Sequence, residues 1–258
     1  MKVPFLSLAT VPFALVALTF VPSAPAQSVA DLVARGDALD ASQQTAKALA
    51  LYLEAEKVRP DDPDLLIKIA TQYGESMVDA SDEAAEKAAG EKALSYALRA
   101  VQLDPELSDA HLAVAICYGR LLDFMPAREK VEYSRKVKVY TEKAIDLDPS
   151  SDYAWHMLGR WHRAVANTNP FLKGFVKVVY GGLPSASVDE AADSLRKAAE
   201  LRHDRVSHHV ELGLTYLDLG RTEDAKKAIQ RGLALPNEER DDPETKARGR
   251  QALEELEG

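Results

Sequence analysis

The sequence predicts an all-α fold: a helical solenoid of five helix–turn–helix repeats followed by a C-terminal capping helix. Strand patterns are nearly absent, whereas Ala, Leu, Glu, Lys and Arg recur at helical periods between short Pro, Asp and Gly breaks. Similar segments that end in proline recur at 52–60, 96–105 and 140–149, which indicates an internal repeat. Hydrophobic residues make up 46% of the 258 and charged residues 28%, a balance that excludes a disordered chain.

The N-terminal residues differ in composition from the rest. Residues 3–21 are apolar, and the small-x-small motif 24–26 precedes Gln27 as at a signal-peptidase site. A membrane-spanning helix is the alternative, but Pro4 and Pro12 interrupt the stretch, Pro22 ends it, and no basic cluster follows it. We therefore expect a cleavable signal peptide at 1–26, a mature domain at 27–258, and a periplasmic or secreted protein.

The repeats fit the tetratricopeptide (TPR) pattern, in which small residues lie where two helices touch and Pro starts the next turn. The first repeat has Gly36, Ala48 and Tyr52 in register before Pro60, and the fourth opens with Trp155 as an expected buried anchor. We place the repeats at 29–62, 63–107, 108–151, 152–205 and 206–239. A polar capping helix is expected at 243–257.

The middle three repeats are longer than the usual 34 or so residues. The extra residues 76–90 and 121–131 are compatible with longer helices, whereas 166–187 contains Pro and Gly and predicts a loop or a broken helix. Its most apolar part, 171–180, favours a lid packed over the solenoid, because large exposed apolar patches are rare. The alternative is a membrane-touching or ligand-covering element with Lys173 and Lys177 on one face.

Three motifs give a more specific resemblance. The Leu-Gly-Arg-Trp helix in 155–161, the Gly-Gly-Leu-Pro-Ser-Ala-Ser turn in 180–191 and the helix end at 197–201 resemble the regulator of microtubule dynamics family. The resemblance covers roughly residues 61–256. It implies a TPR-like fold and a binding module, and it names microtubules and organelle membranes as the setting of the eukaryotic members.

Composition and motifs argue against an enzyme. No phosphate loop, nucleophile elbow or His-Glu-x-x-His motif is present, so we expect no catalytic residue, cofactor or metal. None of the six histidines pairs with another at the helical spacing of metal ligands. Cys117, the single cysteine, is expected to be a small buried residue. A net charge of −9 argues against nucleic-acid binding.

The expected binding surface is the concave face formed by the first helix of each repeat. Its candidate residues in the last three repeats form an apolar groove with a basic spot: Leu112, Ile116, Tyr153, His156, Arg160, Arg163, Val210 and Leu214. This groove fits an amphipathic peptide with an acidic group, or an anionic lipid. The alternative is that the arginines pair with neighbouring acids.

Two functions follow from this pattern. The first is a non-catalytic scaffold that holds a protein or peptide partner in the groove of the solenoid. The second is a solenoid that binds a lipid or small ligand, with the 166–187 insertion as its cover.

Overall fold

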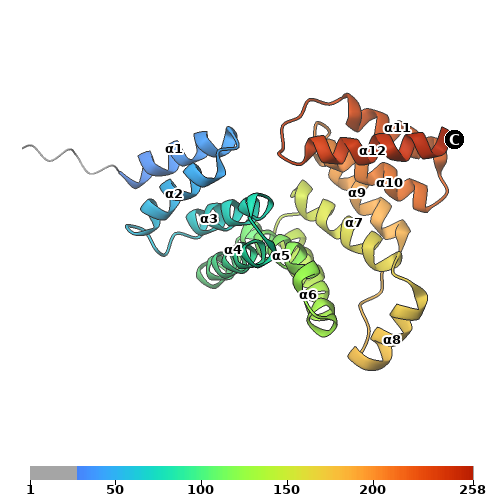
Figure 1. The fold of residues 1–258 in the computed structure, drawn as a ribbon, viewed down its shortest axis with the longest axis horizontal. Helices are drawn as coiled ribbons and strands as arrows, with labels where there is room; N and C mark the ends of the chain where they lie inside the picture. The colour runs from blue at the N-terminus through green and yellow to red at the C-terminus, as the bar shows by residue number, and fades with distance from the viewer. Residues whose placement is uncertain (1–27, 258) are drawn as a thin grey trace, which may run out of the picture.

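The computed structural model describes residues 28–257, which form α-helices, two short 3₁₀ turns and no strand (Figure 1). The predicted signal peptide lies outside the described residues. No helix in the described part of the chain has the length and apolar character needed to cross a membrane. The helices are α1 Val29–Ala41, α2 Thr45–Glu56, α3 Pro63–Ser76, α4 Glu83–Leu103, α5 Ser108–Leu121, α6 Ala127–Leu147, α7 Asp152–Ala166, α8 Pro170–Tyr180, α9 Val188–Leu201, α10 Val206–Asp218, α11 Thr222–Ala234 and α12 Asp242–Glu257.

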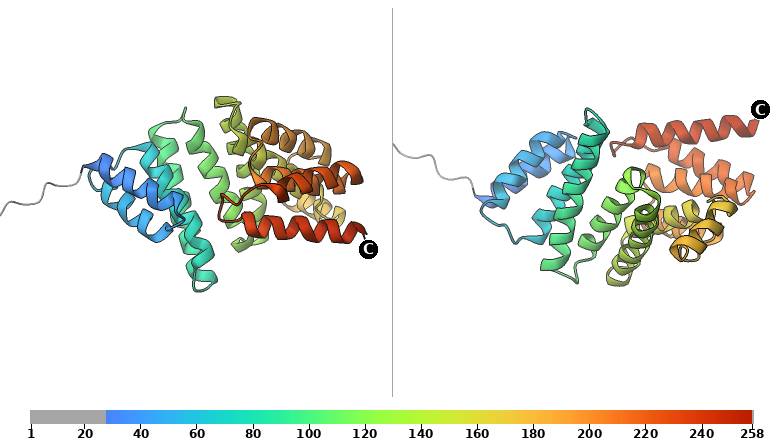
Figure 2. Two further views of the ribbon diagram at one scale, coloured as in Figure 1. Left: turned by 90° about the horizontal axis from the view of Figure 1, so that it is seen from above. Right: turned by 60° about the horizontal axis from the view of Figure 1, so that its bottom comes forward.

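The helices pack as antiparallel pairs in chain order. The pairs are α1 with α2, α3 with α4, α5 with α6, α7 with α9, and α10 with α11, while α12 packs on the last pair. Figure 2 shows the pairs stacked along the chain from the N-terminal to the C-terminal end. The predicted solenoid of five repeats and a capping helix is therefore confirmed.

Small residues bring the paired helices together, as the repeat pattern predicts. A Cβ atom on Gly159 of α7 would lie 2.6 Å from Leu195 Cγ of α9, and one on Gly36 would collide with the Tyr52 ring. Both Tyr52 and Leu195 are fully buried. Each glycine thus lets a large side chain of the partner helix fill the space that its own side chain would take.

The long second and third repeats are built as expected. Their second helices, α4 and α6, are 21 residues each, and each follows a short 3₁₀ turn, at Met77–Asp79 and Leu122–Phe124. Asp82 caps α4 by accepting the Ala85 N–H at 2.8 Å. Such a side-chain acceptor satisfies one of the unpaired N–H groups at a helix start.

Two expectations about the fourth repeat are wrong. The segment 166–187 does contain a helix, α8, but it does not pack as a lid: Phe171 is 85% exposed and Val178 is 87% exposed. Trp155 is only half-buried, and its Nε1 donates to the Pro149 carbonyl at 2.9 Å. The buried tryptophan is Trp161, one and a half turns later on α7. The indole of Trp155 is thus tied to the chain just before α7.

Candidate functional site

The concave face of the solenoid holds a groove of about 620 Å³. Its walls come from α3, α5, α7 and α10, and the start of α12 closes its C-terminal side. Apolar side chains form most of the lining, among them Ile67, Leu112, Ile116, Met157, Trp161 and Val165. A volume of this size is in the range of binding sites for small ligands and short peptide segments.

The connection between α11 and α12 reaches across from the last repeat to the first two (Figure 1). Arg240 in this connection pairs with Asp79, and it donates to the Glu75 carbonyl at 3.3 Å and to Thr45 Oγ1 at 3.5 Å. Asp241, the next residue, lines the groove. The two ends of the solenoid are therefore joined by polar contacts beside the groove.

Charged side chains meet at one end of the groove around Glu211 of α10, which is only 4% exposed. Arg248 of α12 donates to its carboxylate at 2.8 Å, and Arg163 does so at 3.3 Å. Arg163 also holds Asp218 at 2.6 Å. Arg160 lies 4.0 Å from Glu211, and its side chain remains 54% exposed. Arg160 is thus the arginine of this cluster with the most room for a ligand.

Five of the eight residues expected in the groove line it: Leu112, Ile116, Tyr153, His156 and Arg160. Arg163 does not line the groove, because it is paired with Asp218 and Glu211. This agrees with the alternative that the arginines pair with neighbouring acids. Val210 and Leu214 do not line it either. Val210 is fully buried against α11 and α12, because α10 is covered by both helices. The groove face of α10 carries Ser207 and Glu211 instead.

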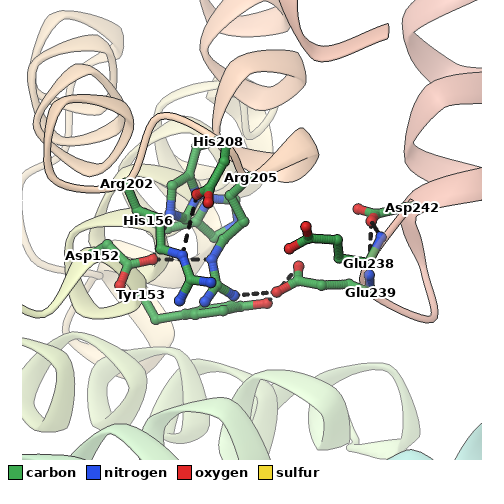
Figure 3. A network of polar contacts seen from close by, with 10 residues as sticks. Asp152, Tyr153, His156, Arg202, Arg205, His208, Glu238, Glu239 and Asp242 are labelled. Atoms are coloured by element: carbon green, nitrogen blue, oxygen red, sulfur yellow. Dashed lines mark hydrogen bonds and ion pairs between the residues drawn. The ribbon is translucent and has the colours of Figure 1, made fainter. Parts of the chain in front are cut away.

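A buried chain of polar contacts backs the groove wall (Figure 3). His208 Nε2 of α10 lies 2.8 Å from Asp152 Oδ2, and its Nδ1 lies 3.0 Å from His156 Nδ1 of α7. A carboxylate only accepts, so Nε2 of His208 carries the proton and, in the neutral ring, Nδ1 accepts. His156 then donates from Nδ1. The three residues fix the contact between α7 and α10.

The same network extends to the α11–α12 connection. Arg205 Nε lies 3.1 Å from Asp152, and its guanidinium also pairs with Glu239. Tyr153 donates to Glu239 at 3.0 Å, and the Arg205 guanidinium stacks 4.1 Å from the centre of the Tyr153 ring. Arg205 therefore links α7 to the segment that closes the groove.

The pKa values of both histidines and of Asp152 are lowered, for different reasons. Burial lowers the pKa of His156 well below its ordinary value, and the charges of His208 and Arg160 act in the same direction. Burial also lowers the pKa of His208, although the bond to Asp152 opposes this. For Asp152, burial would raise the pKa, but the His208 bond and Arg205 outweigh it and lower the pKa. The neutral-histidine form of the network is therefore favoured.

Sequence reasoning missed the histidine pair because it searched for partners within one helix. His156 and His208 are 52 residues apart and meet only through the packing of α7 on α10. One signal was present: Asp152 and His156 are four apart, so they share a face of one helix. If Asp152 and His156 are both buried, a polar residue of another helix must face them and complete their hydrogen bonds.

Carboxylates of Glu239, Asp241 and Asp242 offer oxygens within 4.8 Å of one another, the one group of possible metal ligands in the described part of the chain. Two of these groups already have protein partners. Asp242 accepts the N–H groups of Glu238 and Glu239 at 2.7 and 2.8 Å, and Glu239 is held by Arg205. Elsewhere, Cys117 is buried as expected, and burial raises the pKa of its thiol to about 12.

The chain is similar to proteins of known name. The family model "Regulator of microtubule dynamics protein 1-3" matches residues 32–257. Regulator of microtubule dynamics protein 1 of Mus musculus is 26% identical over 87% of this chain and 74% of its own length. Protein 3 of Xenopus laevis is 25% identical over 79% of this chain but only 44% of its own length.

The fold has a solved counterpart. A thermophilic TPR protein of Thermus thermophilus superposes with a TM-score of 0.63 at 19% identity, covering 88% of this chain and 99% of that one. This likeness confirms the TPR-like fold. Since the family model spans nearly all the described helices, the chain belongs to the regulator of microtubule dynamics protein 1-3 family.

Proposed function

We propose that the protein is a non-catalytic binding module that holds a short peptide segment of a partner protein in the groove between α3, α5, α7 and α10. The observation that carries the proposal is an apolar groove whose one exposed, weakly paired arginine, Arg160, lies beside a buried acid. Apolar side chains of a peptide would cover Leu112 and Ile116. An acidic side chain would replace the distant contact of Arg160 with Glu211 by a direct ion pair.

Binding of a labelled peptide library tests this proposal. Eight-residue peptides with apolar residues around a Glu, and matched peptides with Gln in its place, are titrated by fluorescence anisotropy. We expect the Glu peptides to bind more tightly, and Arg160→Gln to weaken them by about threefold to tenfold, because the arginine is partly exposed. Lys143→Gln, on α6 and outside the groove lining, is the control and should change nothing. Equal affinity for Glu and Gln peptides would contradict the role of Arg160.

The groove volume also favours a second candidate, a lipid or other small apolar ligand. The cover for such a ligand would not be the 166–187 insertion, since no residue of α8 lines the groove. It would be the α11–α12 connection, which lies beside the groove through Asp241. Native mass spectrometry of the purified protein decides between the two: a bound small molecule supports this candidate, and a bare mass supports the peptide.

We further propose that the protein acts outside the cytoplasm, because the apolar stretch 3–21 and the motif before Gln27 have the form of an export signal. N-terminal sequencing of the exported protein should show a chain that begins at Gln27. Chains that still start at Met1 would contradict export by cleavage. The name of the relatives suggests microtubules as a partner. Because we propose that this protein is exported, we expect that it does not co-pellet with microtubules.

A further inference from the structure

Helix α8 turns its apolar side chains to solvent. Phe171 and Val178 are 85% and 87% exposed, and Leu172, Phe175 and Val179 are each about half exposed. Successive helical residues are turned by about 100°, so these five fall within an arc of about 120° on one side of α8. In Figure 1, α8 projects away from the rest of the solenoid. The helix thus presents an apolar face that no described part of the chain covers.

The base of α8 is fixed, so the exposed face is a built feature of the fold. Val176 is the one buried side chain of the helix. At its end, Gly181 takes a left-handed φ of 77°, which glycine adopts without strain. Arg135 of α6 donates to the carbonyls of Tyr180 and Gly182. These contacts hold α8 by its C-terminal end and leave its apolar side free.

The sequence segment that contains α8 is basic, whereas the whole chain is acidic. The net charge is −9 with 41 acidic residues, yet residues 153–188 contain none of them. Lys173 and Lys177 lie on the side of α8 opposite the apolar arc. Among the described residues neither lysine is paired with a carboxylate, and Lys173 Nζ donates to the Ala166 carbonyl at 2.7 Å. An acid-free, basic segment in an acidic protein fits an anionic surface.

We propose that α8 is an interfacial helix that docks the protein on an anionic lipid bilayer. Its apolar arc would enter the boundary between headgroups and acyl chains, and the two lysines would lie at the level of the headgroups. The helix has 11 residues, which suits lying in the surface and not crossing it. This membrane contact is separate from the groove, since no groove-lining residue comes from α8.

A bilayer fits this face better than a protein does. From 170 to 183 the only side chains with polar groups are Lys173, Lys177 and Tyr180. Protein interfaces carry about one hydrogen bond for each 100–200 Å², and α8 offers no such set of groups on its apolar side. Lipid recognition needs only apolar area and positive charge, and α8 supplies both.

A local probe tests the proposal on the full chain. Cys117 is the only cysteine and is buried, so Val178→Cys places an environment-sensitive fluorophore on α8 alone. The control is Val78→Cys, at a site that is 69% exposed in the second repeat. Vesicles of phosphatidylcholine with about one-third phosphatidylglycerol should shift the emission of the α8 probe to the blue, and pure phosphatidylcholine vesicles should do so far less. The Val78 probe should not respond to either.

Two double variants sharpen the result. Phe171→Ser with Phe175→Ser should raise the lipid concentration at half-maximal shift by on the order of 100-fold, about tenfold for each phenylalanine. Lys173→Gln with Lys177→Gln should raise it by on the order of tenfold, and high salt should remove that difference. No shift with anionic vesicles would overturn the proposal. A shift without vesicles that grows with protein concentration would also overturn it, and would indicate contact with a second copy of the chain.

Discussion

Helices α7 and α8 are neighbours in sequence but differ in which side chains they bury and expose. Helix α7 buries polar side chains, among them His156 and His162, and packs on α9 and α10. Helix α8 exposes Phe171, Val178 and the apolar side chains between them, and contacts the body of the protein only weakly. Polar residues usually lie outside and apolar residues inside. Helix α7 departs from this by burying two histidines beside its apolar residues, and α8 departs from it by exposing its apolar side chains.

The buried histidines of α7 and the exposed apolar side chains of α8 have different explanations. The buried His156 of α7 has a partner: it meets His208, and His208 meets Asp152. A buried polar group that is hydrogen-bonded costs little, so this network is explained by the fold itself. The apolar face of α8 has no partner in the described part of the chain. Its explanation therefore lies outside the described part of the chain, whereas that of α7 lies within it.

The largest expected effect is on α7, from Trp161→Ala. The indole is 5% exposed, and its Nε1 donates to the carbonyl and the Oγ of Ser134 at 2.8 and 3.1 Å. Its removal should lower the free energy of unfolding by about 3–5 kcal/mol in urea titrations. Trp155→Ala, at the half-buried position, should cost about 1 kcal/mol. Equal losses would mean that the two tryptophans are packed alike.

Breaking the polar network should have the next largest effect. Asp152→Ala leaves Arg205 and His208 without their shared carboxylate, and we expect a loss of about 1–3 kcal/mol in unfolding free energy. The matched variant Asp189→Ala removes an acidic residue from the first turn of α9 and should cost less than about 1 kcal/mol. A loss for Asp152→Ala no larger than for Asp189→Ala would contradict a stabilising network.

The histidine pair should make stability depend on pH. Burial lowers the pKa of His208 in the folded protein, so protons bind the unfolded chain first as the pH falls. Stability is then complete above about pH 6.5 and is lost below it, toward the folded pKa. Between pH 7.5 and 5.5 the wild type should lose about 1 kcal/mol more than His208→Gln. Arg205 and Arg160 oppose protonation of His156 as well. Parallel pH profiles for both proteins would contradict the assignment.

The smallest effect should come from α8. Phe171→Ser with Phe175→Ser removes only exposed apolar area, so the free energy of unfolding should change by about 0.5 kcal/mol or less. Thermal unfolding followed by circular dichroism measures it. A loss above about 2 kcal/mol would show that α8 packs on the body of the protein.

Sequence reasoning could predict the fold because its signals are local and repeated. The small residue at Gly159 and the proline at Pro60 each mark a fixed place in the repeat. It could not predict which of two tryptophans on α7 is buried, because 155 and 161 both fit an apolar pattern. Sequence reasoning also placed residues 210 and 214 of α10 in the groove, whereas Ser207 and Glu211 line it. That helix is covered by both α11 and α12, and the repeat pattern does not show which of its faces they cover.

The central claim is that the groove binds the partner, and a variant that fills it tests this most directly. Ile116→Trp places a large side chain in the groove at a half-buried position. The matched control is Val139→Trp on α6, which is 61% exposed and lies outside the groove. Anisotropy titration with the tightest Glu peptide should show at least about tenfold weaker binding for Ile116→Trp and unchanged binding for Val139→Trp. Wild-type affinity in Ile116→Trp, with the protein still folded, would contradict the account.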